Sequence, residues 1–272
     1  MSRITPTLAR TRAEGRPALI AYLTVGYPEP EAVLPLVRAA VAGGADIVEL
    51  GVPFSDPLAD GATIQRASFV ALQKGVTPAS CIESVRELRG AGLEIPLLLM
   101  GYYNPVLARG LERLTSEAAA AGADGFIIVD LPPEESAPLR EACGARGLDL
   151  VYLLAPTSTP ERIELVARQA SGFIYCVSVA GVTGARDELP EDLARFVGAV
   201  RKHTDLPLAV GFGISRREHV EALGRIADAA VVGSAIIDVI DGSPPGERES
   251  RVKAYVEVLA GRRRAASPRQ DR

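Results

Sequence analysis

Residues 31–51 have the sequence EAVLPLVRAAVAGGADIVELG. Residues 31–42 carry apolar side chains at the spacing of an amphipathic helix, and residues 46–50 form a short apolar run typical of a buried strand. Gly43 and Gly44 separate the two, in the position where glycine ends a helix and turns the chain. The segment therefore predicts a helix followed by a strand, which is the repeating unit of a parallel α/β fold.

The same alternation of strands and helices continues along the whole chain. Strands are predicted over 18–25, 46–50, 96–100, 125–129, 148–153, 172–177, 208–211 and 229–232. Helices are predicted over 31–42, 63–74, 78–89, 111–121, 134–145, 160–168, 190–203 and 216–224. Because continuous apolar strands are covered on both faces, the sheet is expected to be parallel, and eight such units favour a closed (β/α)8 TIM barrel. The alternative is an open doubly wound sheet, but no Gly-x-Gly-x-x-Gly follows the first strand.

A recurring Gly-Ala-Asp theme supports this repeated architecture. It appears at 43–46, at 121–124 and more weakly at 226–228, each time directly before a predicted strand. Outside the repeats, a helix over 5–14 is expected to cap the barrel bottom, a short phosphate-binding helix is expected to begin at Ser234, and the last helix is expected over 247–260. We expect a single TIM-barrel domain over 1–262 and a basic, disordered tail over 263–272.

The composition narrows the class of function. The chain has 272 residues, of which 47% are hydrophobic and 24% charged, and its net charge is −4. This balance argues against nucleic acid or an anionic membrane as the main partner. No apolar stretch approaches the roughly 18 residues of a membrane span, and residues 1–15 lack the apolar run of a secretory signal.

Cysteine and histidine usage argues against metal chemistry. Cys81, Cys143 and Cys176 lie far apart without metal-ligand spacing, which suits a reducing cytoplasm. Cys176 could be a nucleophile, although a small buried hydrophobe is the commoner role. The only histidines, His203 and His219, lie in polar stretches typical of helix ends or surfaces. A zinc site or a Ser-His-Asp triad would need a better-placed histidine, so we expect no metal and no cofactor in this chain.

Two carboxylates lie near the C-terminal end of the second strand, the end at which barrels of this kind place their active sites. Glu49 lies within the apolar run 47–50 and shares the face of Ile47. A carboxylate on an inward face is costly to ionise, so its pKa should rise, as a general acid near neutral pH requires. A structural role is the alternative for Glu49, and Asp60 could simply cap the helix that begins near Thr63. Two carboxylates in different environments can also divide acid and base roles.

Glycine-containing loops follow the last three strands, at 178–186, 211–215 and 233–237. Glycine lets backbone N–H groups approach an anion closely, and a helix start adds a positive dipole end. Barrels of this class often bind phosphate with the loops after strands seven and eight plus a short helix. Each loop alone could be turn chemistry, but the three together favour a phosphate site.

Apolar side chains occur at or just beyond the strand ends, where a barrel mouth would otherwise be polar. They are Tyr22, Ile64, Met100, Tyr102, Tyr175 and Phe212. They are consistent with a pocket for an aromatic substrate, and ordinary loop packing is the alternative interpretation.

The stretch after the second strand, with four shorter motifs, resembles the tryptophan synthase α chain family. The stretch is Glu49-Leu-Gly-Val-Pro-Phe-Ser-Asp-Pro-Leu-Ala-Asp-Gly61, followed by Ile64-Gln65. The shorter motifs are Tyr102-Tyr-Asn-Pro105, Asp130-Leu-Pro-Pro-Glu-Glu135, Gly181-Val-Thr-Gly-Ala-Arg186 and Gly211-Phe-Gly-Ile-Ser215. The similarity extends over nearly the whole chain.

The resemblance implies a lyase of tryptophan biosynthesis that splits indole-3-glycerol phosphate into indole and glyceraldehyde 3-phosphate by a retro-aldol step. It implies that Glu49 is the acid that protonates indole C3 and that Asp60 takes or stabilises the indole N–H proton. It places the substrate phosphate on Gly184, Gly213, Gly233 and Ser234, and the indole among Tyr22, Ile64, Met100, Tyr175, Thr183 and Phe212. Tyr22 departs from the phenylalanine expected in the family and adds a hydroxyl near the indole.

The resemblance also implies a partner, the tryptophan synthase β subunit, in an α2β2 complex. Pyridoxal phosphate would belong to that subunit. The β subunit would dock on the active-site rim near Pro53, Asp56, Asn104 and Pro132. The isolated chain would then be monomeric and slow.

Three other functions stay open. A free-standing indole-glycerol-phosphate lyase would act without a β subunit. A different phosphate-binding barrel, such as an imidazole-glycerol-phosphate cyclase, would need paired aspartates at the ends of the first and a later strand. The first strand here ends in Leu23-Thr-Val-Gly26, which weighs against that function. A non-catalytic barrel that only activates a partner is disfavoured by the presence of both Glu49 and Asp60.

Overall fold

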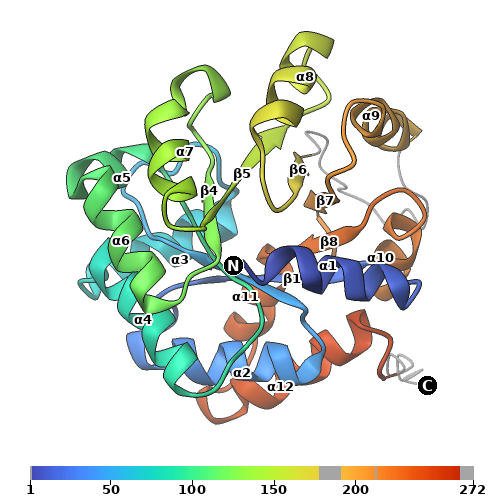
Figure 1. Ribbon diagram of the computed structural model, residues 1–272. Helices are drawn as coiled ribbons and strands as arrows, with labels where there is room; N and C mark the ends of the chain where they lie inside the picture. The colour runs from blue at the N-terminus through green and yellow to red at the C-terminus, as the bar shows by residue number, and fades with distance from the viewer. Residues whose placement is uncertain (1, 178–190, 212, 264–272) are drawn as a thin grey trace.

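The computed structural model describes residues 2–177, 191–211 and 213–263. It shows a closed barrel of parallel strands inside a ring of helices (Figure 1). The strands are β1 (Ala18–Thr24), β2 (Ile47–Gly51), β3 (Leu97–Gly101), β4 (Gly125–Ile128), β5 (Asp149–Leu154), β6 (Ile174–Val177), β7 (Leu208–Gly211) and β8 (Ala229–Val232). They follow one another around the barrel in chain order, and β8 pairs with β1 to close it.

Most of the helices connect successive strands on the outside of the barrel, while the first precedes β1 and the last two follow β8. They are α1 (Ile4–Ala13), α2 (Val33–Gly43), α3 (Ala62–Gln73), α4 (Pro78–Gly90), α5 (Tyr103–Arg109), α6 (Leu111–Ala121), α7 (Ala137–Gly144), α8 (Pro160–Gln169), α9 (Glu191–Arg201), α10 (Arg217–Leu223), α11 (Ser234–Asp241) and α12 (Arg248–Leu259). Short 3-10 helices occupy Pro30–Ala32, Pro133–Glu135 and Pro245–Glu247. In the described residues, no helix is long and apolar enough to cross a membrane.

The strands are buried on both faces, as their apolar sequences predict. In β1 every residue is buried. Ile20 packs inside the barrel, in the same cluster as Ile47 of β2, whereas the alternate residues Leu19 and Leu23 pack with the surrounding helices. Because side chains alternate between the two faces of a strand, the position of Ile47 places Glu49 inside the barrel as well.

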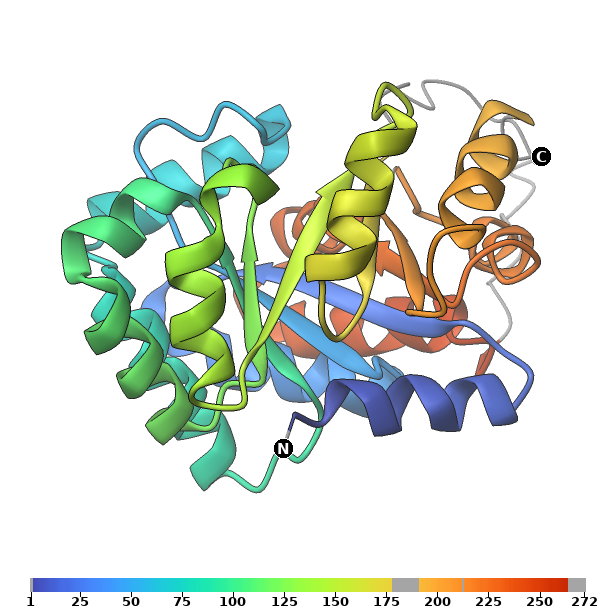
Figure 2. The same cartoon turned by 45° about the horizontal axis from the view of Figure 1, so that its top comes forward.

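Helix α1 closes the N-terminal end of the barrel. Its side chains Ile4 and Leu8 join the cluster of residues that fills the barrel interior. Figure 2 shows α1 across the lower side of the molecule, while β4 and β5 run upward and away from it. The expected capping helix is therefore confirmed, and the opposite end, where the strands finish, remains available for a site.

The Gly-Ala-Asp theme fixes the N-terminal rim of the barrel. An aspartate before an even-numbered strand accepts a hydrogen bond from a backbone N–H of the preceding odd-numbered strand. The pairs are Asp46 with Leu19, Asp124 with Leu97 and Asp228 with Leu208. Each aspartate also pairs with an arginine, respectively Arg16, Arg89 and Arg201. Between β5 and β6 the Ser171 hydroxyl accepts the N–H of Leu150 in the same way. A hydrogen bond from a backbone N–H of an odd-numbered strand to a side chain before the next strand therefore occurs at four strand pairs of the barrel.

The predicted barrel is confirmed, and each expected strand forms within one or two residues of its predicted ends. The sequence did not predict helix α5, because its motif Tyr102-Tyr-Asn-Pro105 contains residues common in turns. Pro105 falls in the first turn of α5, where a missing N–H costs no hydrogen bond. Most of the predicted basic tail lies outside the described residues.

Candidate active site

A cavity of about 370 Å³ opens at the C-terminal ends of the strands. Its lining includes nine of the predicted site residues: Tyr22, Glu49, Asp60, Ile64, Met100, Tyr175, Gly213, Gly233 and Ser234. The other three, Thr183, Gly184 and Phe212, lie outside the described residues. A volume of this size is within the range of small-molecule sites, roughly 300–1,000 Å³. Residues spread over most of the chain thus meet in one pocket.

Glu49 lines the cavity and has no solvent exposure. Neither of its carboxylate oxygens has a hydrogen-bond partner. Burial alone raises the pKa of Glu49 from its ordinary value of 4.5 to about 8, because an isolated charge is costly inside the barrel. At neutral pH this side chain is therefore mainly a carboxylic acid that holds a proton ready to give.

Asp60 also lines the cavity, from the loop between β2 and α3, and its environment differs. The hydroxyl of Tyr102 donates a hydrogen bond to its Oδ2 atom at 3.1 Å. Burial raises the pKa of Asp60, and the hydrogen bond from Tyr102 opposes that rise. The Tyr102 hydroxyl also accepts the backbone N–H of Ala59 at 3.0 Å, so it holds this part of the loop in place. One carboxylate thus has a donor and the other has none.

Two buried tyrosines enclose the pocket, Tyr22 from β1 and Tyr175 from β6. Each hydroxyl lies directly over a glycine of the next strand. A Cβ atom at Gly51 would lie 2.1 Å from the Tyr22 hydroxyl, and one at Gly211 would lie 2.0 Å from the Tyr175 hydroxyl. Both glycines are therefore required by the shape of the pocket, since any side chain there would displace a tyrosine.

The rim at β7 and β8 has the features expected of an anion site. Gly213 has a φ of +53°, a conformation that favours glycine. Gly233 immediately precedes α11, and Ser234 is the first residue of that helix. The first N–H groups of a helix have no partner within it and point outward, where they favour an anion. The predicted short helix after the eighth strand is confirmed.

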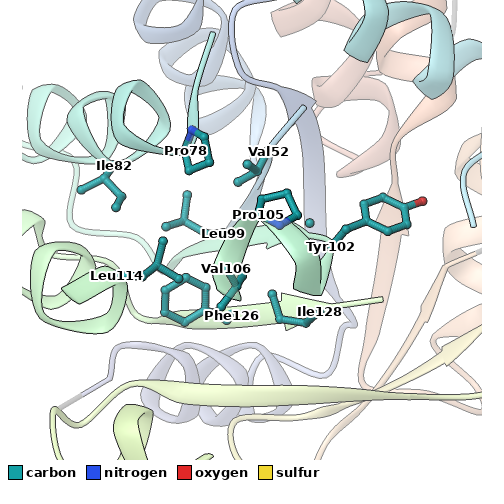
Figure 3. Close-up of a pocket in the computed structure, with 11 residues that line it drawn as sticks. Val52, Pro78, Ile82, Leu99, Tyr102, Pro105, Val106, Leu114, Phe126 and Ile128 are labelled. Atoms are coloured by element: carbon teal, nitrogen blue, oxygen red, sulfur yellow. The ribbon is translucent and has the colours of Figure 1, made fainter. Parts of the chain in front are cut away.

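A second, much smaller cavity of about 20 Å³ lies outside the barrel wall, between β3 and helices α4 to α6. Figure 3 shows its apolar lining, which includes Ile82, Leu99 and Phe126, with the Tyr102 hydroxyl directed away from it. The ring of Tyr102 thus packs against apolar side chains, while its hydroxyl donates a hydrogen bond to Asp60. This cavity is too small for an indole ring, and an apolar void of this kind stays dry.

The cysteines and histidines, which were considered for nucleophilic or metal chemistry, do not line the cavity. Cys176 is completely buried, and burial raises the pKa of its thiol to about 12, so it is no nucleophile. His219 lies in α10, where its Nδ1 atom accepts the backbone N–H of Ser215. Within residues 2–177, 191–211 and 213–263 no group of histidine, cysteine and carboxylate side chains could hold a metal ion.

Sequence reasoning missed part of the site. Val129, Leu153 and Val177 add apolar walls from β4, β5 and β6. Val177 ends its strand and Val129 directly follows its own, so their position on the rim was a usable signal. The hydrogen bond from Tyr102 to Asp60 joins residues 42 positions apart, and no sequence pattern indicated it.

Four features therefore occur together at the mouth of the barrel: a protonated buried acid, a hydrogen-bonded carboxylate, an apolar pocket and a helix N-terminus. This combination is typical of a (β/α)8-barrel enzyme that uses acid–base chemistry on a small ligand.

Comparison with known proteins identifies the family. A sequence model described as tryptophan synthase alpha chain matches residues 8–266, and this chain belongs to that family. The tryptophan synthase alpha chain of Chloroflexus aggregans is 56% identical over 259 residues, covering 95% of this chain and 97% of the relative. The tryptophan synthase of Saccharomyces cerevisiae is 47% identical over 254 residues, but these are 93% of this chain and only 36% of the yeast protein. The crystal structure of the alpha subunit from Legionella pneumophila superposes with a TM-score of 0.89 at 35% identity, covering 96% of this chain and 98% of that one.

Members of this family are lyases that cleave indole-3-glycerol phosphate to indole and glyceraldehyde 3-phosphate in tryptophan biosynthesis. The family carries no cofactor on the α chain, and pyridoxal phosphate belongs to its partner, the β subunit. The enzyme class and the reaction expected from the resemblance are thus confirmed, and the family implies a β-subunit partner.

Proposed function

We propose that Glu49 and Asp60 are the two groups that carry out the cleavage of indole-3-glycerol phosphate in this chain. The observation that carries the proposal is the contrast between them: Glu49 is fully buried without a hydrogen-bond partner, and Asp60 accepts a hydrogen bond from Tyr102. That contrast separates an acid from a base within one pocket.

Glu49 would begin the reaction by giving its proton to C3 of the indole ring. Its raised pKa, about 8, keeps that proton available at neutral pH. The positive charge that then develops on the indole nitrogen would be stabilised by the carboxylate of Asp60, which takes or holds the N–H proton. The Glu49 carboxylate would next accept the proton of the glycerol hydroxyl, so that the carbon–carbon bond breaks, the electron pair returns to the ring and an aldehyde forms.

The remaining lining would hold the two ends of the substrate. We assign the phosphate to the backbone of Gly184, Gly213 and Gly233 and to Ser234, which begins α11. The indole would lie among Tyr22, Ile64, Met100, Tyr175, Thr183 and Phe212. Support comes from the described members of both sets, because they all line the same cavity.

The β subunit would dock on the rim that carries this cavity, in an α2β2 complex. Asp56, Asn104 and Pro132 are exposed there, whereas Pro53, the fourth residue expected to dock, is buried and offers little surface. Leu58 in the same loop is 92% exposed, which is unusual for a large apolar side chain and suits a docking surface. The partial coverage of the yeast tryptophan synthase also fits a relative that contains more than an α chain.

We also propose that the enzyme is cytoplasmic and that residues 1–262 form one catalytic domain. The free, buried state of all three cysteines agrees with a reducing compartment.

Steady-state release of indole from indole-3-glycerol phosphate tests the proposed roles directly. The wild type should produce indole, Glu49→Gln should produce almost none while still binding substrate, and Glu94→Gln should behave as wild type. Glu94 is a suitable control because its side chain is 80% exposed and lies before β3, at the far end of the barrel. Substantial turnover by Glu49→Gln would remove Glu49 from the mechanism.

A further inference from the structure

The Tyr22 hydroxyl occupies a defined place inside the barrel. Tyr22 is 6% exposed and stands in register with Glu49 on the neighbouring strand β2. Its hydroxyl oxygen lies over Gly51, only 2.1 Å from where a Cβ atom of that residue would be. The phenol of β1 therefore leans across β2, toward the C-terminal end of the strand that carries Glu49.

The hydroxyl has a proton to donate and no acceptor for it among the described residues. Its one hydrogen bond comes from the Thr24 hydroxyl, which donates to it at a long 3.4 Å. Burial raises the pKa of Tyr22 well above its ordinary value, and the carboxylates of Asp60 and Glu49 raise it further. The phenol thus stays protonated wherever the enzyme works.

Glu49 has acceptor atoms that lack a hydrogen-bond donor. Both of its carboxylate oxygens are buried and without a partner. Glu49 and Gly51 are two residues apart on the same inward face, a separation of about 6.6 Å along a strand. A glutamate side chain that turns toward the cavity mouth would therefore bring its carboxylate closer to the hydroxyl over Gly51.

We infer that Tyr22 is a positioning residue for Glu49, and that its hydroxyl donates a hydrogen bond to the Glu49 carboxylate once Glu49 has given up its proton. This inference rests on the proposed acid role of Glu49. A buried carboxylate without a donor is costly to form. The hydrogen bond would lower that cost at the moment of proton transfer and hold the carboxylate near the substrate.

The other titratable groups around the cavity are less well placed for this role. Asp60 is itself an acceptor, and it already receives the hydrogen bond of Tyr102. The charge of Glu49 also acts on Tyr175, but the hydroxyl of Tyr175 lies over Gly211 of β7 and not over the strand that carries Glu49. Of the described phenols, only Tyr22 has its hydroxyl over the strand of Glu49.

The test compares the pH dependence of kcat and of kcat/KM for wild type and Tyr22→Phe. The substitution keeps the ring and removes only the donor, so the alkaline limb assigned to Glu49 should move upward by about one pH unit. We expect kcat to fall several-fold, with a smaller change in KM. Tyr152→Phe is the matched control, because it loses a buried tyrosine hydroxyl that bonds Ser136 rather than a group in the cavity. Its alkaline limb should coincide with that of the wild type.

A direct titration keeps the inference testable if Tyr22→Phe is too slow to assay. The infrared band of a protonated buried carboxyl should vanish at a higher pH in Tyr22→Phe than in wild type, and Glu49→Gln should lack the band and so assign it. Coinciding titrations, or a downward movement in Tyr22→Phe, would overturn the role of Tyr22. If instead the wild type makes no indole while the two titrations differ, the pairing stands and the proposed reaction fails.

Discussion

Replacing Glu49 by glutamine should change the pH dependence of stability as well as the activity. Glutamine keeps the shape of the side chain but cannot ionise. In the wild type the pKa of Glu49 rises from 4.5 in the unfolded chain to about 8 in the fold. Because the folded state holds the proton more tightly, the stability linked to Glu49 is fully present below pH 4.5 and is lost as the pH rises to about 8.

The structure gives the size of this effect. Each pKa unit corresponds to about 1.4 kcal/mol, so the rise from 4.5 to about 8 amounts to about 5 kcal/mol. Glu49 has no exposed surface, so solvent screening does not reduce the figure. At pH 4 to 5 both side chains are neutral, and wild type and Glu49→Gln should have similar free energies of unfolding. Above pH 8 the variant should be more stable by several kcal/mol.

Urea unfolding at a series of pH values between 4.5 and 9, with wild type, Glu49→Gln and the exposed control Glu94→Gln, measures the difference. The two curves of wild type and Glu94→Gln should stay parallel, and that of Glu49→Gln should diverge upward with pH. Indole release by Glu49→Gln should fall by at least about 100-fold. Parallel stability curves for all three proteins would show that Glu49 ionises in the fold at an ordinary pH, and the acid role would lose its physical basis.

Four further outcomes test other parts of the molecule. Asp60→Asn should lose most of its indole release, on the order of 100-fold or more; a loss of only a few-fold would show that Asp60 is not catalytic and acts only through its hydrogen bond with Tyr102. Replacing Gly213, whose φ is +53°, by valine should weaken glycerol phosphate binding in calorimetry, because the backbone is strained and the approach to the anion is obstructed. Asp124→Asn should lower the free energy of unfolding by about 3–5 kcal/mol, since it leaves the half-buried Arg89 without its counter-charge; an effect under 1 kcal/mol would contradict the role of the rim aspartates. Adding stoichiometric β subunit should raise kcat for indole release, because its docking would order loops at the rim of the cavity and so lower the entropic cost of reaching the reactive geometry. An unchanged rate in a complex that demonstrably forms would refute this effect of the β subunit.

Most of the fold and much of the site could be predicted from local sequence. The apolar runs and the glycines before them determine where each strand begins, because strand and helix periodicity depend on residues that are neighbours in the chain. The placement of Glu49 on the face of Ile47 followed from the same periodicity, and with it the rise of its pKa. Asp60 could be located on the rim but not distinguished from a helix cap.

Other features depended on contacts between distant segments, and only the tertiary structure decided them. The hydrogen bond from Tyr102 to Asp60, which separates the two carboxylates chemically, requires β3 to end beside the loop after β2. The place of the Tyr22 hydroxyl over Gly51 depends on the register of β1 against β2. The sequence by itself determined which residues could form strands and which face each side chain takes, since both are local properties of the backbone. Strand register and barrel closure determined which of those side chains meet, since both are settled by packing over the whole chain.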